Sequence, residues 1–251
     1  MLPFDVIDHI LSFLQWERAA LTSCSEADPL LSRIAERHFY ARITVEEQIA
    51  PSSEPYTFDQ YQLYKCLHDN PHIAKYVRDL SVLVNPASRM PSITGQPTKQ
   101  KMSIILPMLP LLERIALACP SGYVHWTHLP EKFQQAFMDC LRLPTIRELS
   151  LSGIDFPISS FDRSQTLKKL ELRGITTFEN PNPSSSLRPS FDALSLYYCS
   201  RISRILPWAE TQTLRSLEIG SETDLTELPL LLRVWGPSLT SLNLNMGFGC
   251  K

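Results

Sequence analysis

Apolar residues recur along most of this chain in one short pattern, in which the first, fourth and sixth positions are leucine or a similar residue. The fourth and sixth positions of each copy flank one residue that is polar or small in most copies, and this alternation predicts a short strand with one buried face. The clearest copies span 112–117, 146–151, 167–172, 191–196, 214–219 and 239–244, and earlier copies span 77–82 and 40–45. The recurrence predicts eight related strands.

The spacing of these copies predicts a repeat architecture. Between central apolar residues the distances are 37, 35 and 34 residues in the first units and 21 to 25 residues in the later ones. A self-similar strand at such a period is typical of a right-handed solenoid with a curved parallel sheet, in which each unit packs on its neighbours. The strands are expected near 41–46, 78–83, 113–118, 147–152, 168–173, 192–197, 215–220 and 240–245.

The segments between the copies predict helices early and little helix later. The long first units have room for helices around 58–67, 104–112 and 133–141, the second of which Pro107 and Pro110 interrupt. The later units leave room only for one turn of helix or an extended return. Residues 84–100 and 179–190 are rich in Pro, Ser and Asn and predict surface loops.

The first forty residues follow a helical period instead. Val6, Ile10 and Leu14 recur every four residues, with Ile7 and Leu11 beside them, which predicts one apolar helix face. A second short helix is expected over 19–24. A third is expected to begin at Asp28-Pro29, an N-cap followed by proline. The predicted fold is therefore α/β, with a three-helix module over 1–39 and a repeat solenoid over 40–251.

Composition narrows the range of partners. The net charge of −2 offers no basic surface for a phosphate backbone, so we expect no nucleic-acid partner. The start of the chain shows no basic leader, and the most apolar stretch is too short to span a bilayer, so we expect neither a signal peptide nor a membrane partner. The six cysteines lack C-x-x-C spacing and are expected to be free thiols. These features favour the cytosol or the nucleus.

No catalytic motif stands out. His125 and His128 are three residues apart, but a metal site needs further ligands, and none is suitably placed in the sequence. The chain has no Gly-rich phosphate loop, no nucleophile elbow and no H-E-x-x-H helix. We therefore expect a binding protein, not an enzyme, with no cofactor and no metal. A hydrolase site around the two histidines is the weakest alternative.

The residues between the buried positions of each strand are expected to form the concave surface of the solenoid. Most of these residues carry mixed charges typical of a solvated face. The densest group that combines charge with an aromatic ring lies on two neighbouring strands, and arginine and tyrosine are frequent anchors in interfaces. These candidate substrate-binding residues are Lys169, Glu171, Arg173 and Tyr197.

The beginning of the chain resembles the F-box. The resemblance rests on the Leu2-Pro3 start, the Ile10-Leu11 pair and the following Leu14. Together with the leucine-rich repeats, nearly the whole chain is similar to the F-box-like proteins of mushroom-type fungi, including residues 70–82 at the first repeat strand. The third helix departs from the family pattern, because it lacks the usual Trp.

The resemblance implies a role in protein ubiquitination. The F-box helices would bind the Skp adaptor of a cullin–RING ubiquitin ligase, and the repeats would bind a protein substrate. The positions that match the adaptor contact or its support are Leu2, Pro3, Ile7, Ile10, Leu11 and Leu14. The alternative is a stand-alone leucine-rich-repeat scaffold, whose N-terminal helices only cap the first repeat.

Overall fold

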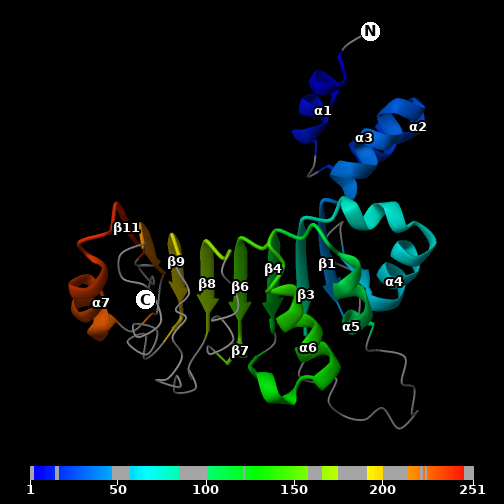
Figure 1. Ribbon diagram of the computed structural model, residues 1–251. Helices are drawn as coiled ribbons and strands as arrows, with labels where there is room; N and C mark the ends of the chain where they lie inside the picture. Colours follow the sequence, from blue (N-terminus) through cyan, green and yellow to red (C-terminus); the bar gives the residue numbers. More distant parts are fainter. Residues whose placement is uncertain are drawn as a thin grey trace, which may run out of the picture.

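The computed structural model describes residues 3–14, 17–46, 57–84, 101–120, 122–157, 166–174, 191–199, 214–220, 223 and 225–245. These residues form a mixed α/β fold with one nine-stranded parallel sheet, a separate two-stranded sheet and seven α-helices (Figure 1). The large sheet is open, with β11 at one edge and β2 at the other. The expectation of an α/β fold with a parallel sheet is confirmed.

The large sheet is built from strands of three to five residues. Its spatial order is β11-β10-β9-β8-β6-β4-β3-β1-β2, so most neighbours in space are also neighbours in sequence. The strands are β1 (Arg42–Glu46), β2 (Thr57–Asp59), β3 (Asp79–Leu83), β4 (Arg114–Ala118), β6 (Glu148–Ser152), β8 (Lys169–Arg173), β9 (Ala193–Tyr197), β10 (Ser216–Ile219) and β11 (Ser241–Leu244). Because each neighbour is parallel, a crossover separates every consecutive pair.

One face of this sheet is a ladder of aliphatic side chains. Leu80, Ile115 and Leu149 lie in register on adjacent strands, and Leu170 and Leu194 continue the row. All five are 0 or 1% exposed. Since side chains alternate along a strand, the residues between them point to the opposite face, which we call the open face.

Helices cover the apolar face. They are α4 (Gln60–Asp69), α5 (Met102–Ile105), α6 (Glu131–Cys140) and α7 (Leu228–Trp235), and the 3₁₀ helices η1 (Pro71–Lys75), η3 (Leu106–Met108), η4 (Trp126–His128) and η7 (Leu225–Glu227) lie in the same crossovers. Leu67 of α4, Phe137 of α6 and Trp235 of α7 are completely buried in the core that contains the strand leucines. Asp59 and Gln62 form a capping box that fixes the start of α4.

The first three helices have a core of their own. We call α1 (Phe4–Ser12), α2 (Arg18–Ala27) and α3 (Pro29–Tyr40) the helical head, which stands beyond the amino end of β1 in Figure 1. Its buried residues are Leu11, Leu21, Ile34 and Ala35, a cluster separate from that of the sheet. Asp28 caps α3 by accepting a hydrogen bond from the Leu30 amide at 2.7 Å.

The strands lie where the repeated pattern predicts them. Each of the eight begins one residue after its expected position. The helices expected around 58–67 and 133–141 correspond to α4 and α6, and the prolines confine the middle one to the single turn α5 followed by η3. The loop expected over 179–190 and residues 85–100 of the other loop lie outside the described residues.

One expectation about the crossovers is wrong. The later units were expected to hold at most a turn of helix, but the crossover between β10 and β11 contains the eight-residue helix α7. A strand of four residues leaves about twenty for the return, and two helical turns advance the chain by only about 12 Å. Strand β2 and the small sheet of β5 (Val124–His125) and β7 (Ile154–Asp155) were not expected either.

Two further expectations concern thiols and membranes. Five cysteines in the described residues are free, and Cys119, Cys140 and Cys199 are buried. Burial raises the pKa of the Cys140 thiol to about 12, so it stays protonated at neutral pH. Within the described ranges, no helix has both the length and the apolar character needed to cross a bilayer.

Candidate functional site

The helical head exposes an apolar stripe on α1. Val6, Ile10 and Phe13 are 42, 49 and 71% exposed. Their spacing of four and three residues places them on one side of the helix, and Leu11 on the other side is only 4% exposed. Phe4 is also exposed. We call Val6, Ile10 and Phe13 the α1 stripe.

Polar contacts fix how α1 sits on the head. The Asp8 carboxylate accepts hydrogen bonds from the Arg37 guanidinium and from the His38 ring nitrogen, the latter at 2.9 Å. Both partners belong to α3. The α1 stripe is thus held in a defined orientation by polar contacts on α3 and by Leu11 in the head core.

The predicted adaptor residues divide between the two sides of α1. Ile10 lies in the α1 stripe and Pro3 is exposed, whereas Leu11 is buried and Ile7 and Leu14 pack partly against the head core. Leu2 lies outside the described residues. The prediction omitted Phe13. Its position one helical turn after Ile10 could have placed it on the same side of the helix.

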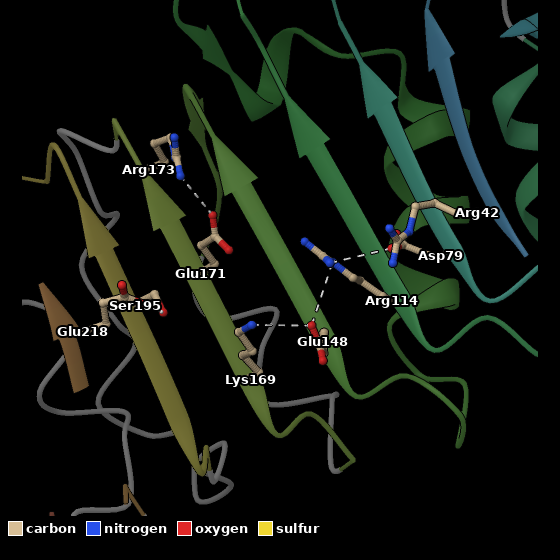
Figure 2. Close-up of polar contacts among 9 residues, drawn as sticks. All are labelled: Arg42, Asp79, Arg114, Glu148, Lys169, Glu171, Arg173, Ser195 and Glu218. Carbon is tan, nitrogen blue, oxygen red and sulfur yellow. Dashed lines mark hydrogen bonds and ion pairs between the residues drawn. The ribbon is translucent and has the colours of Figure 1, made fainter. Parts of the chain in front are cut away.

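The open face of the sheet carries a row of alternating charges across five strands (Figure 2). Asp79 lies 2.9 Å from the Arg42 side chain and 3.7 Å from that of Arg114. Glu148 lies 3.8 Å from both Arg114 and Lys169. We call these five residues the charge ladder. The basic members are about 40% exposed, so each ion pair adds only about 0.2–1 kcal/mol to the free energy of unfolding. The main effect of each pair is to orient the two side chains.

One carboxylate of the charge ladder, Asp79, has a shifted pKa. Burial raises the pKa of Asp79 above its ordinary value, although the neighbouring Arg114 and Arg42 act in the opposite direction. Asp79 is the most enclosed member, with 16% of its side chain exposed.

The predicted substrate-binding residues lie together on β8 and β9, but they do not act as one group. Arg173 lies 3.5 Å from the Glu171 carboxylate, and its guanidinium stands 4.7 Å from the centre of the Tyr197 ring. Lys169 contacts Glu148 of the charge ladder instead. Arg173, Glu171 and Tyr197 therefore form a local unit beside the ladder.

The next strand completes this unit with residues that the sequence prediction missed. Gly220 leaves space for the Tyr197 ring, because a Cβ there would lie 1.9 Å from Tyr197 Cδ1. The Glu218 carboxylate accepts hydrogen bonds from Ser195 Oγ at 3.3 Å and from Asn243 Nδ2 at 3.4 Å. The pKa of Tyr197 is raised to about 12. Partial burial is the largest cause, and the hydrogen bond to Glu218 and its negative charge raise the pKa further. The sequence could have pointed to Glu218, because it occupies the same position in its strand as Glu171 does.

The two histidines singled out by their spacing lie away from the open face. His125 on β5 contacts the Asp155 carboxylate at 3.0 Å, and the ring centres of His125 and His128 are 5.2 Å apart. In the part of the chain that the structure describes, no three His, Cys, Asp or Glu side chains are grouped closely enough to hold a metal ion.

Comparison with known proteins gives no family assignment. No family model matches the chain, and no curated protein sequence is similar to it. The α1 stripe and the open face are therefore the two observations from which a function is argued.

Proposed function

We propose that this protein is the substrate-recognition subunit of a cullin–RING ubiquitin ligase. In this proposal the helical head is an F-box-like module that binds a Skp-family adaptor. The sheet and its crossovers form a leucine-rich-repeat solenoid whose open face binds a protein substrate. The observation that carries the proposal is the α1 stripe, an exposed apolar surface on a helix that also contributes Leu11 to a core.

The α1 stripe has the form expected of a helix that docks into a groove. An amphipathic helix recognised in this way presents apolar anchors at spacings of three and four residues, which is the spacing of Val6, Ile10 and Phe13. Contiguous exposed apolar side chains are unusual on a surface with no partner. The resemblance of the first residues to the F-box indicates a Skp-family adaptor as the partner.

The connection between the head and the sheet supports a role in presenting a substrate. Only Ala41 separates the end of α3 from the start of β1. Its carbonyl accepts hydrogen bonds from the amides of Arg78 and Asp79 at 2.9 and 3.0 Å. A junction tied to the next strand favours a fixed distance between an adaptor on the head and a substrate on the open face.

The second candidate is a repeat scaffold whose helical head only caps the first strands. Contacts between the head and the repeats favour it, since Glu36 of α3 lies 3.3 Å from His72 of η1 and the Tyr40 ring stacks on Phe58 at 6.5 Å. However, β2 already lies beyond β1 at that edge of the sheet. A cap would also have no need for an exposed stripe on its outer side.

Adaptor capture distinguishes the two candidates. The full chain is co-expressed with a Skp-family adaptor, and the amount of adaptor that co-purifies is measured. We expect the intact chain to retain the adaptor and the double variant Val6→Asp, Ile10→Asp to lose it, since both side chains are exposed and a folded head tolerates the change. Ala19→Asp, at an exposed position on α2, is the matched control and should bind normally.

The remaining outcomes also decide between the candidates. An intact chain that captures no adaptor overturns the ligase proposal. The capping alternative then requires that a fragment of residues 40–251 unfold or aggregate. A fragment that stays in solution and unfolds cooperatively contradicts capping.

A further inference from the structure

Three carboxylates on the open face have a basic partner in the chain itself. Asp79 pairs with Arg42, Glu148 with Lys169 and Glu171 with Arg173, at 2.9, 3.8 and 3.5 Å. Glu218 differs from them. Among the described residues, no basic side chain lies within ion-pair distance of its carboxylate.

The contacts of Glu218 leave it able to accept more. Its hydrogen bonds from the Ser195 hydroxyl at 3.3 Å and the Asn243 amide at 3.4 Å are longer than the usual ranges of about 2.5–3.0 Å and 2.7–3.2 Å for these donors. The third contact, with Tyr197, also involves a neutral group. A carboxylate has about four acceptor positions, and a charged donor forms roughly twice as strong a hydrogen bond as a neutral one. The carboxylate is therefore complementary to a cation.

The surroundings of Glu218 allow a side chain to approach. Across the open face its nearest positions hold Ser195 and Asn243, and along its own strand they hold Ser216 and Gly220. These residues are small or short. Ser195 is only 6% exposed, whereas Asn243 is exposed, so a side chain approaches Glu218 from the β11 side. A large neighbour is Tyr197, whose ring lies against Gly220 and the Arg173 guanidinium.

We infer that the part of the open face formed by β9, β10 and β11 binds a basic side chain, arginine or lysine, of a protein partner. Glu218 forms the ion pair, and the Tyr197 hydroxyl and Asn243 amide hold its carboxylate in place. The inference rests on the proposed function only in placing a protein substrate on this face. A metal ion would need more ligands than Glu218 provides. A phosphate group would be repelled.

Selection from a random peptide library tests this inference without any adaptor. Displayed twelve-residue peptides are selected against the immobilised full chain, and the frequency of each residue type is compared with the unselected library. We expect arginine or lysine to be enriched at one position. Synthetic copies of the selected peptides should bind Glu218→Gln about tenfold more weakly, as expected for loss of a charge-assisted hydrogen bond.

Two further variants separate a local ion pair from net charge. Glu131→Gln removes the same charge from an exposed position on α6, on the helix side of the sheet, and should leave binding unchanged. Glu218→Asp keeps the charge at the same position and should bind the selected peptides more tightly than Glu218→Gln does. The inference is overturned if no basic position is enriched, or if Glu218→Gln binds the selected peptides as well as the intact chain does.

The result is independent of the adaptor test. If Glu218→Gln still captures the adaptor but loses the peptides, the inference and the ligase proposal both stand. If the intact chain selects basic peptides but captures no adaptor, the ligase proposal alone fails.

Discussion

Strands β10 and β11 carry the same pattern of leucine and isoleucine but differ in burial. Leu217 and Ile219 of β10 are fully buried, whereas Leu242 and Leu244 of β11 are 44 and 41% exposed. β10 lies between β9 and β11, while β11 has one strand neighbour in the described residues. A leucine in this fold is therefore buried by the units on both sides of it and not by its own unit alone.

The largest effect should come from truncating the same side chain in the two strands. Leu217→Ala should lower the free energy of unfolding by about 2–5 kcal/mol, because it leaves a cavity in the core. Leu242→Ala should lower it by less than about 1 kcal/mol, since the side chain is already partly in water. Urea unfolding of the full chain, followed by circular dichroism, measures both values. Equal losses would contradict the comparison.

A smaller effect is expected at the residues that follow the two strands. Gly220 lies beneath the Tyr197 ring, whereas its counterpart Asn245, which follows β11, is exposed. Gly220→Ala should destabilise the protein by about 1–3 kcal/mol, because the new Cβ displaces the ring. Asn245→Ala should change stability by less than about 0.5 kcal/mol. Thermal unfolding of the two variants provides the measurement.

A double variant tests the cause assigned to Gly220. When Tyr197 is replaced by Ala, the ring is gone and Gly220→Ala should become neutral or even stabilise by about 0.4–1 kcal/mol through a less flexible unfolded chain. If Gly220→Ala destabilises both backgrounds equally, contact with the ring is not the reason for glycine at this position.

The strands could be predicted because the pattern is repeated and each copy faces the same environment. Alternation of leucine with polar residues fixes which side of a strand is buried, and the register then aligns Leu80, Ile115 and Leu149. Strand β2 has no such signal, since Thr57, Phe58 and Asp59 are all half-buried. Its pairing depends on the tertiary position of α4.

The candidate sites could be predicted only in part. Both sides of α1 are apolar in sequence, so the exposed Ile10 and the buried Leu11 look alike until α3 is placed against the helix. On the open face the positions of Arg173 and Tyr197 followed from the strand pattern. That no basic side chain of the described residues pairs with Glu218 did not follow, because it depends on which side chains of neighbouring strands meet.

The smallest effect concerns the middle positions of the two strands, which hold Glu218 in β10 and Asn243 in β11. Tyr197 should titrate with a pKa of about 12, above the ordinary value of 10.0, and the difference in tyrosinate absorbance between the intact chain and Tyr197→Phe isolates it. Glu218→Gln should lower this pKa, since a neutral amide no longer disfavours the phenolate. Asn243→Ala, which changes no charge, should shift it little.

The sign of the accompanying change in stability follows from where the proton is held. A raised pKa means that folded Tyr197 keeps its proton between pH 10 and about 12 while the unfolded chain loses it. The contribution of Tyr197 to stability is therefore complete below pH 10 and declines as the pH rises through this window. Glu218→Gln should reduce the decline. A Tyr197 pKa that is the same in Glu218→Gln as in the intact chain would show that Glu218 does not contact the hydroxyl, and the ion-pair site on β10 would then lose one of its two orienting groups.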